Sequence, residues 1–222
     1  MTIIHKHFAD NTSEHSVATQ LRRQRFDVFM EMLKDLPRPV KILDIGGSQG
    51  YWEMMADRTL LDREFQITLL NIENQAVSIP SFTAAIGDGR AMPEFADKQF
   101  DIVFSNSTIE HVGSFEDQKR MADEVRRVGK RYYIQTPNLF FPVEPHFVFP
   151  LFQFFPIAFR AWLLQHFDLG WYTKIPDYQK ALHEVKSIRL LHRAEFKQLF
   201  PEAIIFEEKF YGMVKSFVSF TP

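Results

Sequence analysis

The stretch that decides the fold of this chain is Val40–Gly50, which reads VKILDIGGSQG. Its first six residues are mostly apolar or β-branched, and Gly46 and Gly47 follow directly. Such a run predicts a short buried strand that ends in a tight turn, after which a helix begins at about Tyr51. Glycines between a strand and a helix let the backbone adopt a positive φ and approach a ligand closely. The stretch therefore predicts a ligand-binding turn at the carboxyl end of the first strand.

Strand and helix patterns alternate along most of the chain. Helical spacing predicts one helix over 16–36 and another over 115–128, with Ser114 as its N-cap and Gly129 as its C-terminal cap. Apolar runs predict further strands over 65–72, 82–86, 100–105 and 131–136. This alternation is typical of a parallel sheet that is covered by helices on both faces.

The carboxyl-terminal part departs from this alternation. A last helix is expected over 190–200, and two strands are expected over 203–210 and 213–220, joined around Tyr211-Gly212. So short a connection permits only an antiparallel hairpin. The expected fold class is therefore α/β, with a Rossmann-like seven-stranded sheet that is mostly parallel, a C-terminal antiparallel hairpin and helices on both faces.

A Phe-rich insertion follows the fifth strand, over 139–189. Between Phe147 and Gln165 its only charged residue is Arg160, but prolines and polar residues interrupt the run, so a membrane span is not expected. Three interpretations stay open, of which we favour the first: a lid over the substrate, a peripheral membrane contact through 147–167, or a homodimer interface. We expect one domain over 1–222, with an N-terminal helical segment over 1–36 and this lid-like insertion.

Composition excludes several classes of protein. The chain has 222 residues, 26 Lys and Arg against 28 Asp and Glu, and no Cys. A general nucleic-acid binder would show a basic excess, and a disulfide framework or thiolate zinc site would need cysteine. The first residues lack an apolar stretch of signal-peptide length. We therefore expect a cytoplasmic enzyme that does not bind nucleic acid.

The glycine spacing argues against a dinucleotide site. A G-x-G-x-x-G motif counted from Gly46 would need glycine at Ser48 and at Tyr51. Asp44, just before the turn, would repel a phosphate and attract a ligand that carries an amino group. The turn thus favours a cationic ligand.

Four motifs, in order, are similar to one known family. Asp44-x-Gly46-x-Ser48-x-Gly50 resembles the D-x-G-x-G-x-G motif of class I S-adenosylmethionine (SAM) dependent methyltransferases. The stretch 87–93 resembles the family's G-D-A-x-x-L-P loop, and 100–112 resembles its fourth strand and the following loop. The terminal hairpin is also similar to the family's ending. The chain resembles the type 11 subgroup, which implies SAM as the cofactor.

The resemblance implies a role for each motif residue. Residues 44–50 would line the methionine part of SAM, Asp88 would accept from the adenine amino group, and the Gly89 backbone would lie on the ring. Ser105 and Asn106 would close over the sulfonium side. The full set of implied cofactor contacts is Asp44, Gly46, Gly47, Ser48, Gly50, Asn71, Glu73, Asp88, Gly89, Ser105 and Asn106.

The ribose contact has two candidates within that set. Direct alignment places Asn71 where the family has an acidic residue, and Glu73 follows two residues later. We favour Glu73, because a carboxylate can accept from two ribose hydroxyls whereas an amide offers one acceptor and a donor.

A base for the acceptor's proton has four candidates, of which we favour His111, His146 and Glu144. Glu110 and His111 follow the fourth strand, and Glu144 and His146 lie in a proline- and Phe-rich segment after the fifth. Histidine titrates near neutral pH, although a purely structural role stays open for each residue. We see no cluster of carboxylates like that of metal-dependent O-methyltransferases, so no metal is expected.

Together these patterns lead to one functional expectation. We expect SAM-dependent transfer of a methyl group to a small, largely apolar metabolite by in-line displacement. We favour oxygen as the acceptor atom, and amine or carbon acceptors stay open. A nucleic-acid or protein methyltransferase stays open, but the residues 105–108 are not the N-P-P-Y type tetrapeptide of enzymes that methylate base amines. A non-catalytic SAM- or nucleotide-binding protein is the other alternative.

Overall fold

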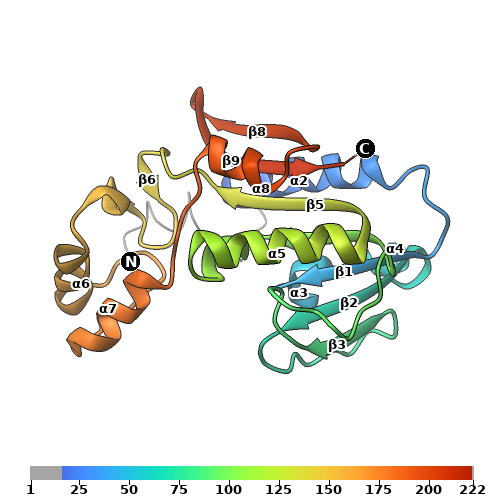
Figure 1. Cartoon of the computed structure of the whole chain (residues 1–222), viewed down its shortest axis with the longest axis horizontal. Helices are drawn as coiled ribbons and strands as arrows, with labels where there is room; N and C mark the ends of the chain where they lie inside the picture. Colours follow the sequence, from blue (N-terminus) through green and yellow to red (C-terminus); the bar gives the residue numbers. More distant parts are fainter. Residues whose placement is uncertain (1–16, 222) are drawn as a thin grey trace. The chain divides into compact units, whose positions relative to one another are not determined.

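A computed structural model describes residues 17–221 of the chain, which divide into two compact units (Figure 1). Unit 1 comprises the chain up to Asn106, the stretch 124–134 and the residues from Phe220 onward. Unit 2 comprises Ser107–Asp123 and Gln135–Ser219. The N-terminal segment expected over 1–36 is seen only from Val17, since residues 1–16 lie outside the described part.

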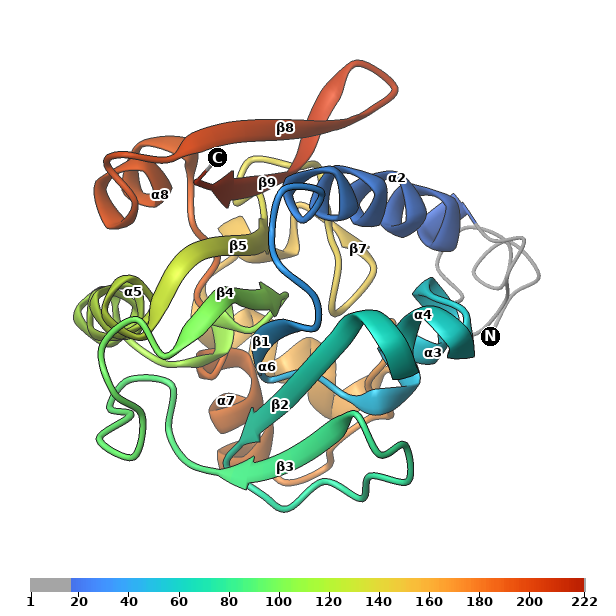
Figure 2. The same ribbon diagram turned by 90° about the vertical axis from the view of Figure 1, so that its right-hand side faces the viewer.

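Seven strands form the large sheet, in the order β3-β2-β1-β4-β5-β9-β8 (Figure 2). Pairing is parallel between β1 and β2, β1 and β4, and β2 and β3. The neighbours β8 and β9 are joined only by Tyr211-Gly212 and form the antiparallel hairpin. The strands are β1 (Val40–Ile45), β2 (Phe65–Asn71), β3 (Phe82–Ile86), β4 (Phe100–Asn106), β5 (Gly129–Pro137), β8 (Ile204–Phe210) and β9 (Met213–Phe220). The expected fold class is confirmed.

The strand order reverses between β1 and β4, which both belong to unit 1. Their register pairs Ile42 with Ile102 and Asp44 with Phe104, so both strands end at the same edge. The Ser105 hydroxyl donates to the carbonyl oxygen of Ile45 at 3.1 Å and ties the two ends together. In open α/β sheets, ligands bind beyond the carboxyl ends of the strands where the order reverses.

Helices α2 (Val17–Met32), α3 (Gln49–Met55) and α4 (Arg58–Glu64) lie on one side of the unit 1 strands, and α5 (Phe115–Val128) lies on the other (Figure 2). Aromatic side chains fill the core beneath α2 and α3. The rings of Phe29 and Trp52 both contact Phe104 edge-on or tilted, and Tyr133 stacks on Phe104 with 5.4 Å between ring centroids. These aromatic side chains, Phe29 and Phe104 among them, therefore form part of the core of unit 1.

One residue of α2 departs from its polar character, and one expected helix cap needs correction. Arg25 is buried, and its neighbour Phe26 belongs to the core. Gly129 does not cap α5; it is the first residue of β5. A Cβ at Gly129 would lie 2.7 Å from a methyl group of Val103, so glycine there permits close strand packing.

Unit 2 builds a separate apolar core inside the insertion. Helices α6 (Ile157–His166) and α7 (Tyr178–Lys186) pack together, and the buried side chains include Phe147, Phe152 and Leu164. The remaining elements are β6 (Val143–Glu144), β7 (Phe149–Pro150), α8 (Arg193–Leu199) and the 3₁₀ turns η1 (Ile109–His111) and η2 (Phe152–Phe154).

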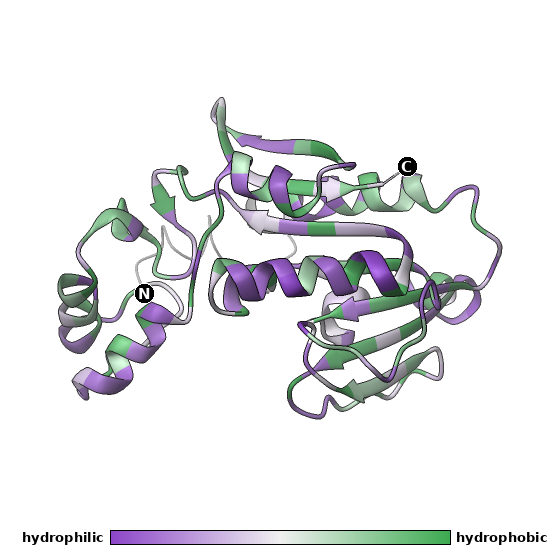
Figure 3. Cartoon of the chain, viewed as in Figure 1, coloured by the Kyte–Doolittle hydropathy of each residue, from purple (hydrophilic) through white to green (hydrophobic). Residues whose placement is uncertain are grey.

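Hydropathy differs between these elements (Figure 3). The strands β1 and β2 contain many apolar residues, whereas α5 contains many hydrophilic residues. In the insertion, large side chains are left exposed, among them Phe154, Phe159, Trp162 and Trp171. Within the described part of the chain, every helix is too short or too polar to cross a bilayer.

Candidate functional site

The glycine turn after β1 is the first part of the site. Gly46 has a φ of 78°, and its N–H donates to the carbonyl of Leu70 at 2.9 Å. Gly47 is needed for space, because a Cβ there would lie 1.7 Å from Oδ2 of Asp44. Ser48 instead has a φ of −137° and caps α3, accepting from the Tyr51 N–H. The middle position of the motif therefore does not require glycine.

Asp44 lies buried directly beneath this turn. Its Oδ2 accepts a hydrogen bond from Trp52 Nε1 at 2.8 Å, while Oδ1 has no hydrogen-bond partner among the described residues. Burial raises the pKa of Asp44 to about 7, against the lowering effect of the Trp52 hydrogen bond. A buried carboxyl group with an unused acceptor is suited to a cationic ligand, which would supply the missing partner.

The two ribose candidates lie in different settings. Asn71 ends β2, and its Nδ2 donates to the carbonyl of Gly47 at 3.0 Å, so it supports the glycine turn. Glu73 is exposed. Gln49, which the sequence analysis did not single out, accepts from the N–H groups of Ser78 and Ile79 and holds the loop after β2. The choice of ribose ligand stays a prediction.

Asp88 and Gly89 lie in the turn after β3. Both carboxylate oxygens of Asp88 are bonded by Arg90, with Nη2 2.6 Å from Oδ2. The Arg90 hydrogen bond holds the pKa of Asp88 below its ordinary value. An adenine amino group would therefore share this carboxylate with Arg90, a partner that the family motif does not reveal.

Arg25 and Tyr51 join the same edge of unit 1. Arg25 Nη2 lies 3.5 Å from Oδ1 of Asn106, and the Tyr133 hydroxyl donates to the Arg25 carbonyl at 2.8 Å. Burial raises the pKa of Tyr51 to about 12, with opposing effects of Arg25 and Asp44. Of the three arginines at positions 22, 23 and 25 of α2, Arg25 is the buried one, and the sequence analysis did not single it out.

Unit 2 holds a second cluster of polar groups, formed by Glu110, His111, Thr136, Glu144 and His146. Nδ1 of His146 lies 2.8 Å from Oε1 of Glu144, and the Nε2 atoms of His146 and His111 lie 3.1 Å apart. Glu110 is fully buried; its Oε2 accepts from the Thr136 hydroxyl at 3.1 Å. All four base candidates are therefore brought together.

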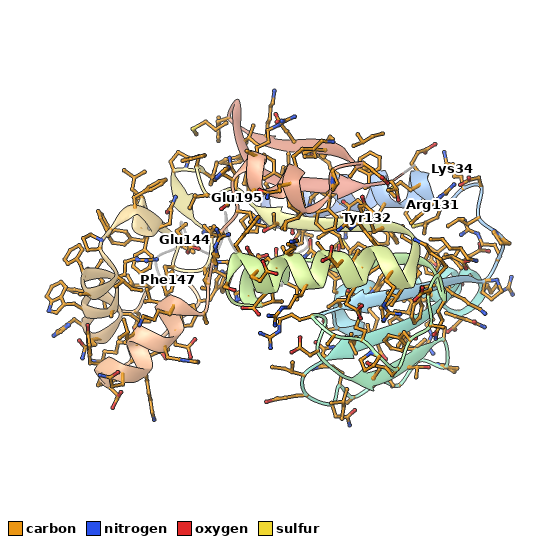
Figure 4. The ribbon with its side chains drawn as sticks, viewed as in Figure 1. Lys34, Arg131, Tyr132, Glu144, Phe147 and Glu195 are labelled. Atoms are coloured by element: carbon orange, nitrogen blue, oxygen red, sulfur yellow. The ribbon has the colours of Figure 1, made fainter. Side chains whose placement is uncertain are left out.

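Backbone contacts hold the two segments that supply this cluster, the turn after β6 and the 3₁₀ turn η1. Glu144 ends β6, and its Oε2 accepts from the backbone N–H groups of His146 and Phe147, both at 2.8 Å. Figure 4 labels Glu144 and Phe147, which lie close together in the insertion. Gly170 packs so tightly on this turn that a Cβ would lie 2.6 Å from the His146 carbonyl oxygen. On the other side, the carbonyl of Glu110 accepts from the Arg189 N–H at 2.8 Å.

The surroundings shift the pKa values of the cluster residues in opposite directions. Burial raises the pKa of Glu110 to about 7. Although His111 is exposed on one side, protein packed around its ring and the charge of His146 lower its pKa to about 4. Burial alone would lower the pKa of His146, but the Glu144 hydrogen bond and the charges of Glu144 and Glu110 together outweigh burial and raise that pKa.

An open cavity of about 750 Å³ lies elsewhere in unit 1. Its lining includes Lys41, Phe65 and Phe100, which begin or nearly begin their strands. It thus opens at the amino ends of the strands, away from the glycine turn. We assign no function to it.

Comparison with known proteins finds a match to the segment that contains the glycine turn. Residues 43–132 match the family model described as a methyltransferase domain. The chain is similar to two Mycobacterium tuberculosis proteins described as uncharacterized, MT1557 of strain CDC 1551 and Rv1509 of strain H37Rv. Each is 26% identical over 137 residues, which cover 57% of this chain and 45% of the relative. The chain therefore spans less than half the length of these relatives.

Solved structures share the fold. The CurJ carbon methyltransferase superposes with a TM-score of 0.57 at 13% identity, covering 98% of this chain and 56% of that chain. The citrinin polyketide synthase CMeT domain gives a TM-score of 0.53 at 12% identity, with 91% and 52% covered. At these identities the likeness establishes the fold alone.

Proposed function

We propose that the chain transfers the methyl group of SAM to a small, largely apolar acceptor, at an oxygen atom, on the premise that residues 43–132 match the methyltransferase-domain family model. The observation that carries the proposal is the glycine turn of unit 1. It covers a buried carboxyl group, Asp44, whose Oδ1 has no partner among the described residues, at the edge where the strand order reverses. A sulfonium nucleoside with an amino group fits this acceptor.

SAM itself supplies the activated methyl group, so the chain needs mainly to bind and orient. In the proposal, Asp44 and the turn 46–50 hold the methionine part, and Asp88 with Gly89 holds the adenine. Asn71 or Glu73 binds the ribose, and Ser105 and Asn106 fix the edge beside the sulfonium. Alignment of this kind contributes several kcal/mol to lowering a barrier, on the order of 7 to 11 in model reactions.

The polar cluster of unit 2 is proposed to take the acceptor's proton. Glu144, His146 and His111 form a continuous chain of short contacts, which starts at a buried carboxylate and ends at an exposed imidazole. A carboxylate that holds one ring nitrogen of a histidine fixes its tautomer and makes the other nitrogen available. Such an arrangement suits a hydroxyl acceptor, which must lose a proton on methylation.

The acceptor class follows from the exposed aromatic side chains of the insertion. Phe159 and Trp162 stack with 5.7 Å between ring centroids, and both are more than two fifths exposed. We propose that this surface binds the apolar body of the acceptor, since aromatic rings combine apolar area with geometric preference. The balanced charge of the chain does not favour a nucleic acid as acceptor.

A methyl-transfer assay tests the proposal. The full chain is incubated with SAM carrying a labelled methyl group and a panel of apolar phenols, alcohols, carboxylic acids and amines, and S-adenosylhomocysteine is measured. We expect turnover with oxygen acceptors and a large loss of kcat in the His146→Ala variant at unchanged affinity for SAM. SAM binding without turnover on any acceptor of the panel would favour a non-catalytic SAM-binding protein.

A further inference from the structure

The group Glu110, His111 and His146 of unit 2 has a geometry that proton transfer alone does not explain. Each residue offers one ligand atom, and these three atoms lie within 4.8 Å of one another. They come from η1 and from the turn after β6, more than thirty residues apart in the chain. Sequence reasoning expected no metal, because it searched for carboxylates and could not see that these residues converge.

The spacing of the two imidazole nitrogens fits a shared cation. Zinc–nitrogen bonds of 2.0–2.1 Å in a tetrahedron place two nitrogens about 3.3 Å apart. The Nε2 atoms of His111 and His146 are 3.1 Å apart, with the ring planes at 89°. At this separation both Nε2 atoms can bind the same ion, in place of their direct hydrogen bond with each other.

Glu110 supplies the missing third ligand. The residue is fully buried, and its Oε1 has no hydrogen-bond partner among the described residues, whereas Oε2 is bonded by Thr136. A buried carboxylate oxygen without a partner carries a large desolvation cost. A cation between the two imidazoles and this carboxyl group would remove that cost.

The surroundings resemble the support that protein metal sites usually have. Histidines that bind a metal generally donate their other ring N–H to a carboxylate, which fixes the tautomer. His146 has this arrangement, because its Nδ1 lies 2.8 Å from Glu144 and Glu144 is itself held by two backbone N–H groups. The exposed side of His111 leaves a path for the ion to enter.

We propose that Glu110, His111 and His146 form a binding site for one divalent cation of the zinc class, with Glu144 and Thr136 as supporting residues. Two histidines and one carboxylate are a zinc ligand set that leaves a fourth position open for an oxygen ligand. The proposal rests on the proposed function and refines one step of it: with the cation bound, the cation activates the acceptor's oxygen in place of the imidazoles.

Zinc titration of the full chain tests the site without SAM or acceptor, so its outcome is separate from that of the methyl-transfer assay. Protein stripped with a chelator is titrated with ZnCl₂ in a calorimeter, and Co²⁺ is added in parallel to record visible absorption. We expect one Zn²⁺ per chain, a rise in Tm and the absorption of a low-symmetry, four- or five-coordinate Co²⁺ centre.

Variants decide whether these residues are the ligands. Glu110→Gln, which keeps the shape of the buried group, and His146→Ala are expected to weaken zinc binding more than about 100-fold, and Glu144→Gln by about 10- to 100-fold. The controls His166→Ala and Glu184→Gln change a histidine and a carboxylate elsewhere in unit 2 and should bind as the unaltered chain does. Absence of stoichiometric binding, or unchanged affinity in Glu110→Gln and His146→Ala, would overturn the site.

Discussion

Asp44 and Asp88 show how one residue type takes two roles at the same sheet edge. Asp44 is almost fully buried and has one hydrogen-bond donor, Trp52, so burial raises its pKa to about 7. Asp88 is partly exposed and carries a bidentate ion pair with Arg90, which lowers its pKa. The first carboxyl group is ready to gain a cationic partner, whereas the second already has one.

The buried state of Asp44 makes stability depend on pH. The folded chain keeps the Asp44 proton up to about pH 7, while the unfolded chain loses it near 3.8, so the unfolded state binds fewer protons in between. Asp44 therefore lowers the free energy of unfolding as pH rises from about 4 to about 7, by about 4 kcal/mol in total. Comparing urea unfolding of the unaltered chain and Asp44→Asn across this range isolates the contribution. Parallel pH profiles for the two proteins would contradict it.

Removing the Asp88 carboxylate should weaken cofactor binding. We expect Asp88→Ala to raise the Kd for SAM about tenfold, the value of roughly one charge-assisted hydrogen bond. Calorimetric titration with SAM measures the change. Asp62→Ala, which breaks the exposed Asp62–Arg58 ion pair on α4, is the matched control and should leave the Kd unchanged. An unaltered Kd in Asp88→Ala would refute the adenine contact.

At the scale of elements, Gly47 in the turn after β1 and Gly50 in the first turn of α3 have different space requirements. Gly47 lies against Asp44, where a Cβ would meet Oδ2 at 1.7 Å, whereas a Cβ at Gly50 would have nothing within 4 Å. Gly50 also lies inside α3. The packing therefore requires glycine at position 47 and does not require it at position 50.

Alanine at each glycine should have opposite effects. Gly47→Ala is expected to displace Asp44, lower stability by about 1 to 3 kcal/mol and abolish SAM binding. Gly50→Ala should raise stability by about 0.5 to 1 kcal/mol, because alanine favours a helix more than glycine does. Thermal unfolding and SAM titration of both variants measure this. Equal behaviour of the two variants would show that the described turn is wrong.

The same elements show which features the sequence can predict. The strands β1, β2, β3 and β4 were predicted to within one residue, because each is a mostly apolar or β-branched run with clear ends. Helix α4 was missed, since its seven residues carry four charges and too few apolar side chains for helical periodicity to be visible. Burial of Arg25 depends on side chains from β4 and β5, which no local pattern contains.

The candidate site also has features that the sequence predicts and features that it does not. The turn residues 44–50 and the loop 87–89 could be found because a motif keeps its functional residues at fixed spacing. The ion pair of Asp88 with Arg90 and the contact of Glu110 with Thr136 depend on side-chain conformations and on tertiary packing. The sequence names the four base candidates one at a time, and the structure shows that Glu110, His111, Glu144 and His146 lie in one cluster.

At the scale of the whole molecule, each unit has its own core. Unit 1 packs the aromatic residues of α2 and α3 on its strands, and unit 2 encloses an apolar cluster around Phe147 and Phe152, whose rings stack 4.2 Å apart. Separate cores allow one unit to lose stability while the other keeps its structure.

A cavity in the unit 2 core should therefore have a local effect. We expect Phe152→Ala to cost about 3 to 5 kcal/mol of the stability of unit 2, with faster amide hydrogen exchange in α6 and α7. Exchange in β1 and β2 and the Kd for SAM should stay as they are. Phe159→Ala, at an exposed ring of α6, is the control. An equal increase of exchange in both units would argue for a single cooperative core.

The most direct test of the account is the binding of SAM itself. The full chain is titrated calorimetrically with SAM, with S-adenosylhomocysteine and, for comparison, with NAD, and Tm is recorded for each. The account predicts one SAM or S-adenosylhomocysteine per chain with a rise in Tm, and no response to NAD. Neither heat nor stabilisation with the two sulfur nucleosides would contradict the cofactor, the residues assigned to it and the proposed reaction.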